Sequence, residues 1–203
     1  MKHPTSRALH TYWNRLRGER CAPERSEIEP GEIRHLLADS LILEIGVPMR
    51  EAHLRLAGTR VCALFGRELR GLPFGGLWEP DAALAGPAHA ESWRILEIVA
   101  GEGVGAVMGL RGHTAAGEGL DLELLLLPLR HRGRTHARML GTLSPLTVPH
   151  WIGLRPLIRL ETVSLRILGS GARPLPDAVP PAPANDAAPV RRGHLLVHRG
   201  GRA

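Results

Sequence analysis

Residues 55–71 read Arg-Leu-Ala-Gly-Thr-Arg-Val-Cys-Ala-Leu-Phe-Gly-Arg-Glu-Leu-Arg-Gly, and this stretch decides the predicted fold. Gly58 marks a turn, and Thr59 can cap the free backbone N–H groups at the start of a helix. Val61 and Phe65 lie one helical turn apart, so they predict an apolar face that packs on a core. The stretch therefore predicts a strand that ends in a glycine turn, followed by a two-turn helix.

Extended segments lie on both sides of this stretch. Residues 41–45 are mostly bulky aliphatics, residues 53–56 alternate, and the short connection between them favours a hairpin. Further along, residues 104–110, 120–129 and 137–143 form three successive strand candidates separated by glycine-bearing turns. We therefore predict a hairpin followed by an antiparallel meander.

The middle strand of this meander has two different faces, because side chains alternate along a strand. One face is apolar throughout, with Leu120, Leu122, Leu124 and Leu126. The other begins polar and then turns apolar, with Asp121, Glu123, Leu125 and Leu127. The second face needs a cover, and a helix at the N-terminus is the obvious candidate.

That N-terminal helix is predicted from apolar side chains at helical spacing, namely Leu9, Tyr12, Trp13 and Leu16. Thr5 or Ser6 could serve as its N-cap, and Gly18 could end it. The apolar face must dock either on the chain's own sheet or on a second subunit. We expect the protein to be a homodimer that uses these four residues as its dimer face.

The remaining segments are less regular. Pro30 suits the first position of a second short helix, whose buried stripe would be Ile33, Leu36 and Leu37. Residues 87–100 form a stronger helix, with Trp93 and Leu96 on one face. Residues 151–168 are mostly apolar, but their period is ambiguous and we assign them no type.

A length of 203 residues suits one domain with extensions. The order of elements predicts the α+β class, with a five-stranded antiparallel sheet covered by short helices. We expect an N-terminal helical extension, a core, a C-terminal extension, a flexible Pro/Ala-rich linker and a basic strand-like tail, at residues 1–38, 39–147, 148–169, 170–190 and 191–203.

Residues 55–71 resemble the divergent bacterial PAS family five, and the resemblance covers about residues 6–145. Other pieces support it, namely Trp13 with Leu16-Arg17-Gly18, Ile28-Glu29-Pro30, Ile33-Arg34, Leu36-Leu37 and Leu77-Trp78. The closing segment from His194 to Arg202 also looks like that family's C-terminal end. PAS domains are mainly sensory or protein-interaction modules, so the resemblance implies a non-enzymatic regulator in signal transduction.

The resemblance also implies that the sheet and its helices enclose a cavity for a small ligand. The candidate residues for lining this pocket or core are Arg55, Val61, Phe65, Trp78, Trp93, Leu96, Leu122 and Leu124. The alternative is a ligand-free interaction scaffold, which a tightly packed aliphatic interior would favour. No cofactor is predicted, although an unidentified small ligand is possible.

The histidines and cysteines suggest several cofactor or metal sites, each of which has a simpler explanation. His89 could be an axial haem ligand, but a solvated residue in the first turn of its helix is the simpler reading. Cys62 lacks the sequence around a photosensory flavin cysteine and reads as an inert thiol. The pairs His131 with His136 and His194 with His198 have no convincing third metal ligand.

Catalysis is not expected, because no known motif brings a nucleophile and base together. Asp121 and Glu123, the most tempting carboxylate pair, read as solvent-exposed strand residues.

A formal net charge of +6 raises the question of a nucleic-acid partner. Aromatic residues make up only 3%, however, which argues against base stacking, and the arginines are spread along the chain. Arg191, Arg192, Arg199 and Arg202 make the tail the best candidate for contacts with phosphate. We favour a tail in which residues 195–197 add a strand to a sheet edge, so the expected partner is a signalling protein and not a nucleic acid.

Cys21 and Cys62 are the only cysteines, and they form no disulfide framework. The N-terminus resembles no secretory signal, and no apolar run approaches the roughly 20 residues of a membrane span. We therefore expect a cytoplasmic protein.

Overall fold

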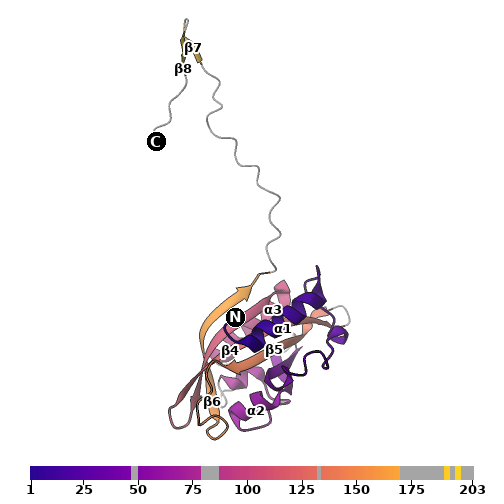
Figure 1. The fold of residues 1–203 in the computed structure, drawn as a ribbon, viewed down its shortest axis with the longest axis vertical. Helices are drawn as coiled ribbons and strands as arrows, with labels where there is room; N and C mark the ends of the chain where they lie inside the picture. Colours follow the sequence, from indigo (N-terminus) through magenta and orange to yellow (C-terminus); the bar gives the residue numbers. More distant parts are fainter. Residues whose placement is uncertain (47–49, 79–86, 132–133, 170–189, 193–194, 198–203) are drawn as a thin grey trace. The chain divides into compact units, whose positions relative to one another are not determined.

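A six-stranded antiparallel sheet organises the chain, with the strand order β2-β1-β5-β4-β3-β6 (Figure 1). The strands are β1 (Ser40–Gly46), β2 (Glu51–Ala57), β3 (Gly105–Thr114), β4 (Gly119–His131), β5 (Arg134–Pro145) and β6 (Leu157–Leu168). The helices are α1 (Pro4–Arg17), α2 (Thr59–Phe65) and α3 (Pro87–Glu102), with short 3-10 turns η1 (Arg25–Glu27), η2 (Leu37–Asp39) and η4 (Phe74–Leu77).

This computed structural model describes residues 1–46, 50–78, 87–131, 134–169, 190–192 and 195–197. Met1–Ser170 form one compact unit and Gly171–Ala203 a second. The predicted linker at residues 170–190 lies almost entirely outside the described residues. In the second unit, β7 (Val190–Arg192) pairs with β8 (Leu195–Val197) in a two-stranded sheet of its own. Residues 195–197 therefore have a strand partner within the second unit, and their addition to the edge of another sheet stays a prediction.

The antiparallel α+β architecture is confirmed, including the hairpin of β1 with β2 and the meander of β3, β4 and β5. The sheet has one strand more than the five expected, because the untyped segment supplies β6, which pairs with β3. Leu157 and Leu160 of β6 are buried, whereas Ile158, Val163 and Leu165 are exposed. The apolar residues of β6 therefore follow neither a strand nor a helix period, which explains why its sequence pattern was ambiguous.

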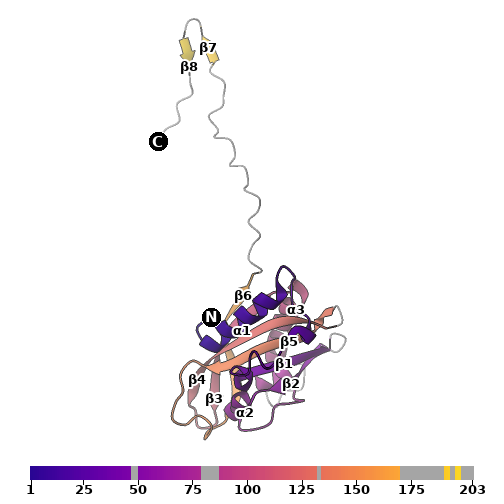
Figure 2. The same cartoon turned by 45° about the vertical axis from the view of Figure 1, so that its right-hand side comes forward.

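The two faces of β4 are covered by different layers, as its alternation predicted. Leu120, Leu122, Leu124 and Leu126 belong to the larger core, with residues of α2, η4 and α3. Leu125, Leu127 and Leu129 belong to a second core, with Leu9 and Trp13 of α1. Figure 2 shows α1 lying across β4 and β5. The N-terminal helix is therefore the cover for the outer face, as expected.

The helix ends differ in detail from the predictions. The N-cap of α1 is His3, whose Nδ1 accepts a hydrogen bond from Thr5 N at 3.2 Å. Ser6 is instead buried, with its hydroxyl oxygen 3.4 Å from Oγ1 of Thr142. Gly18 ends α1 as expected.

The predicted helix after Pro30 is wrong in form, because the chain makes successive turns there and ends in η2. Ile33 and Leu36 are buried, but Leu37 is exposed. The start of α2 also differs from the prediction. Gly58 is its N-cap without a side-chain hydrogen bond, so Thr59 does not cap the helix.

Candidate functional site

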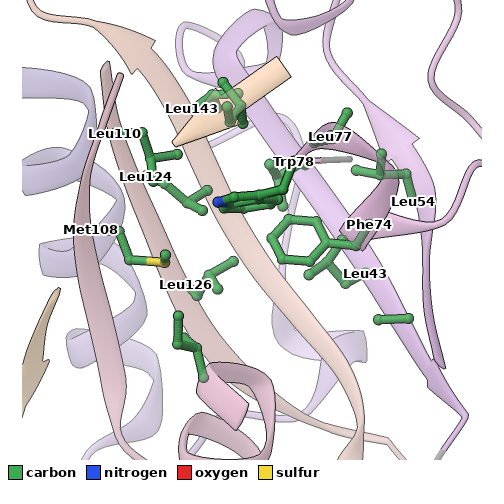
Figure 3. Close-up of a cluster of buried hydrophobic side chains, with 14 of the residues drawn as sticks. Leu43, Leu54, Phe74, Leu77, Trp78, Met108, Leu110, Leu124, Leu126 and Leu143 are labelled. Carbon is green, nitrogen blue, oxygen red and sulfur yellow. The ribbon is translucent and has the colours of Figure 1, made fainter. Parts of the chain in front are cut away.

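Seven of the eight candidate lining residues meet in the larger core between the sheet and α2, η4 and α3. They are Val61, Phe65, Trp78, Trp93, Leu96, Leu122 and Leu124, and each is 5% exposed or less. Figure 3 shows the Trp78 ring among the leucines of β3 and β4, with Phe74 beside it. Their ring centroids are 5.1 Å apart in an edge-on arrangement. These seven side chains therefore lie together in the interior of the first unit.

The two interior tryptophans differ in their hydrogen bonds. Trp78 donates from Nε1 to Oγ1 of Thr162 at 3.0 Å, which ties η4 to β6. Trp93 has a buried Nε1 with no acceptor among the described residues. A buried N–H group without an acceptor is costly, and a bound molecule that carries an acceptor would relieve that cost. Among the described side chains of this core, Trp93 thus offers a buried donor that a ligand could use.

Arg55, the eighth candidate, does not join this interior. Ile42 pairs with Leu56 and Leu43 pairs with Leu54, so Arg55 is the extra residue of a β-bulge in β2. A bulge changes where a side chain points. Arg55 is exposed and forms an ion pair with Glu44 at 2.9 Å. Arg55 therefore lies outside the core, because strict alternation does not hold across a bulge.

Arg55 instead lines a surface pocket of about 410 Å³. Four of the lining side chains are arginines, one is a carboxylate, and the others are apolar: Arg25, Arg55, Arg70, Arg138, Glu68, Ile42, Leu56 and Ala57. Sequence reasoning missed this group, because its members come from η1, β1, β2, β5 and the segment after α2. No local motif links these segments.

A family model described as "PAS domain" matches residues 1–144. This chain belongs to the PAS domain family. PAS domains are generally sensory modules and not catalysts, and the antiparallel sheet with its few helices is the fold of that family.

Two light-oxygen-voltage proteins are among the solved structures that match this chain. The LOV protein of Rhodobacter sphaeroides is 18% identical with a TM-score of 0.40, and the match covers 61% of this PAS chain and 71% of that chain. An RNA-binding light-oxygen-voltage receptor is 19% identical with a TM-score of 0.42, and the match covers 62% of this chain and 36% of the receptor. No curated protein matches the sequence.

The expected dimer face of this PAS chain is covered from within. Leu9, Tyr12 and Trp13 are buried against the outer face of the sheet, and Leu16 packs partly buried at its margin. Trp13 also donates from Nε1 to the carbonyl oxygen of Pro128 at 2.8 Å. This corrects the prediction, since apolar side chains already buried in their own subunit cannot form an interface with another. Of the two alternatives for α1, docking on the chain's own sheet is the one found.

The carboxylates of β4 do not behave alike. Asp121 is exposed, as expected, and pairs with Arg111 at 2.6 Å. Glu123 is buried, which corrects the prediction of a solvent-exposed residue. Its carboxylate accepts hydrogen bonds from the backbone N–H groups of Lys2 and His3 at 2.5 and 3.0 Å. The start of α1 therefore covers Glu123 and supplies its partners.

Burial opposes the ionised form of Glu123, but several hydrogen bonds favour it. Those from Lys2 N–H, from the Ser6 hydroxyl and from His3 N–H together outweigh burial and lower the pKa of Glu123. Glu123 is thus an ionised anchor for the N-terminal helix.

The other reactive side chains show no built site. Burial raises the pKa of the half-buried Cys62 thiol, which keeps it protonated at neutral pH. The described part of the chain holds no group of three or more His, Cys, Asp or Glu side chains placed to bind a metal. The side chains of His89 and His136, and the whole of His194 and His198, lie outside the described residues. Among the described helices, none has the length and apolar character to cross a membrane.

Proposed function

We propose that this PAS domain is a non-enzymatic sensory and regulatory module in bacterial signal transduction that binds a small ligand, a partner protein, or both. Family membership supports the regulatory role. The single observation that supports a ligand is the buried Nε1 of Trp93, which has no acceptor among the described residues. The ligand would be a largely apolar molecule with one hydrogen-bond acceptor, because the surrounding side chains are apolar.

Native mass spectrometry of the protein purified from its source host tests this proposal. A reproducible excess mass over the bare chain is expected, and the occupied fraction should fall in Trp93→Phe but not in Trp78→Phe. Trp78 is the matched control, because its Nε1 already has an acceptor in Thr162. A bare chain mass for the wild-type protein at every step of a gentle purification would contradict the ligand.

A second candidate is a ligand-free interaction scaffold, and the packing around Trp78 favours it. The indole ring is surrounded by four side chains that are each 2% exposed or less, namely Phe74, Met108, Leu110 and Leu124 (Figure 3). Output would then pass to a partner protein through the surface. A bare chain mass, together with a specific partner retained through purification, would support the scaffold over the ligand-binding sensor.

The homodimer stays a prediction, and it has to use a surface other than the apolar face of α1. The cytoplasmic location and the role of the basic tail also remain predictions. Mass measurement by light scattering tests the dimer directly, since a single monomer mass at all concentrations would contradict it.

A further inference from the structure

The arginine pocket lies on the outer side of the sheet and is separate from the larger core around Trp78 and Trp93. Its four arginines come from four separate parts of the chain: Arg25 from η1, Arg55 from β2, Arg70 from the segment after α2, and Arg138 from β5. Like charges repel one another, so four guanidinium groups around one hollow carry an electrostatic cost. The fold brings them together through three structural devices.

The first device is the bulge in β2, which makes Arg55 the extra residue opposite Ile42 and Leu43. A bulge is a common means of redirecting a side chain next to a functional site. Arg55 and Arg138 then share one counter-ion, Glu44, at 2.9 and 3.9 Å.

The second device holds Arg70 beside the edge of β2. Leu54 donates its N–H to the carbonyl oxygen of Leu72 at 2.9 Å, and Gly71 donates to that of Leu54 at 2.6 Å. The carboxylate of Glu68 accepts from the backbone N–H groups of Leu69 and Arg70 at 3.0 and 2.9 Å. The segment therefore follows the strand edge and is not a free loop.

The third device anchors η1, which carries Arg25. Arg130 of β4 donates its backbone N–H to the carbonyl oxygen of Pro23 at 2.8 Å, and its side chain pairs with Glu24 at 3.4 Å. A capping box between Glu24 and Glu27 closes the turn. Arg25 is thus held on the sheet side by both backbone and side-chain bonds.

The charges of this pocket do not balance. Glu44 and Glu68 are the two carboxylates beside the four guanidinium groups, which leaves an excess of two positive charges. Among the described residues, neither Arg25 nor Arg70 forms an ion pair within 4.0 Å, although Glu68 interacts electrostatically with Arg70. Both guanidinium groups are therefore open to a ligand. Hydrogen bonding from Arg70 N–H lowers the pKa of Glu68, so this carboxylate stays ionised at neutral pH. It is one of the two negative charges beside the four guanidinium groups.

We propose that this pocket binds the phosphate group of a small phosphorylated molecule. A phosphate monoester carries close to two negative charges near neutral pH, which matches the excess charge of the pocket. Guanidinium groups bind phosphate oxygens in pairs, through two parallel hydrogen bonds. Ile42, Leu56 and Ala57 provide an apolar wall for the rest of the molecule, and about 410 Å³ is the size of a small-molecule site. The site is separate from the interior, so neither ligand requires the other.

Isothermal titration of the full chain with phenyl phosphate tests the proposal, because this probe has a phosphate dianion and a small apolar ring. The double variant Arg25→Gln/Arg70→Gln should bind at least about tenfold more weakly, since charge-assisted hydrogen bonds are lost. The matched control is Arg159→Gln/Arg166→Gln on β6, at the opposite edge of the sheet. It removes the same charge and should bind within about twofold of the wild-type protein.

Glu68→Gln should raise the affinity, because it removes a negative charge from the pocket. The amide oxygen of Gln can still accept hydrogen bonds from the backbone N–H groups of Leu69 and Arg70. This variant should therefore bind phenyl phosphate more tightly than the wild-type protein. Benzoate, with one charge, should bind more weakly than phenyl phosphate. Circular dichroism melting of each variant confirms that it is folded.

Two results would overturn the proposal: no binding of phenyl phosphate to the wild-type protein, whether or not a phosphopeptide binds, or an equal loss in the β6 control. The ligand of the interior is tested separately, because the loss of retained mass in Trp93→Phe does not depend on the arginines of this pocket. Failure of this site and failure of the proposed sensor are therefore distinguishable.

Discussion

The carboxylate of Glu123 in β4 accepts a hydrogen bond of 2.5 Å from the backbone N–H of Lys2, a residue 121 positions earlier. This bond and the one from His3, the N-cap of α1, attach the N-terminal end of the helix to the middle of the sheet. Ser6 of α1 also contacts Thr142 of the neighbouring strand. The contact between α1 and the sheet is therefore polar at the N-terminal end of the helix and apolar further along it, at Leu9 and Trp13.

Replacement of Glu123 by Gln should lower the free energy of unfolding at pH 7 by about 1–3 kcal/mol, the usual cost of losing a charged partner for buried groups. The pKa of Glu123 in the folded state lies below its ordinary value of 4.5. The ionised carboxylate therefore stabilises the fold above about pH 4.5, and this contribution is lost as the pH falls through the lower, folded-state pKa. Urea unfolding between pH 3 and pH 7 measures the difference between the two proteins.

The matched control is Asp121→Asn on the same strand, where the carboxylate is exposed and pairs only at the surface with Arg111. It should change the free energy of unfolding by less than about 1 kcal/mol. A Glu123→Gln variant as stable as the wild-type protein at pH 7 would contradict the attachment.

Trp13→Ala should destabilise the subunit itself by about 3–5 kcal/mol, because it leaves a cavity between α1 and β4. It also leaves the carbonyl oxygen of Pro128 without the indole N–H that it accepts. Chemical unfolding measures the loss, and Thr11→Ala on the exposed side of the same helix is the control. If Trp13→Ala instead changed only the subunit mass in light scattering, the packing of α1 on its own sheet would be wrong.

Trp78→Phe should cost about 1 kcal/mol more than Trp93→Phe in thermal or chemical unfolding. The two substitutions remove the same part of a buried ring, but only the first removes a hydrogen bond, the one from Nε1 to Thr162. Equal losses, or a larger loss at Trp93, would show that the Trp93 N–H group has an acceptor in the folded chain.

Gly58→Ala should destabilise the protein by about 1–3 kcal/mol or more, the range found for overpacked sites. A Cβ atom at Gly58 would lie 2.2 Å from the carbonyl oxygen of Leu37 and 2.3 Å from that of Ala38. Both are backbone atoms, so no side-chain rotation relieves the contact. Gly76→Ala is the control, because a Cβ there meets nothing within 4 Å. Equal melting temperatures for the two variants would contradict this close approach.

The packing around Gly58 shows both the reach and the limit of prediction from sequence. The glycine turn and the helix over residues 59–65 were predicted from residue type and spacing alone. The reason for glycine was only partly predicted, since the closeness of Leu37 and Ala38 arises when η2 packs on the turn. The prediction that Thr59 caps α2 is wrong. A threonine at the start of a helix is typical of a cap, but its residue type does not show whether its hydroxyl group reaches a backbone N–H group.

What the sequence determined by itself is the set of local periods. The alternation along β4 defined its two faces, the spacing of Leu9, Tyr12 and Trp13 defined the apolar face of α1, and the run from Val61 to Phe65 defined α2. Burial of apolar side chains is a property of residue type, so these patterns predicted the antiparallel α+β fold. The seven apolar residues among the eight lining candidates lie in its interior.

What only the tertiary structure decided is where polar groups of distant segments meet. The docking of α1 on the sheet decides that this helix covers its own subunit and that Glu123 is buried. The bulge in β2 decides that Arg55 points away from the core and joins Arg70. Hydrogen bonds and ion pairs act between particular atoms over about 3 to 4 Å, and chain folding alone sets those separations. The periodicity of a sequence contains no information about them.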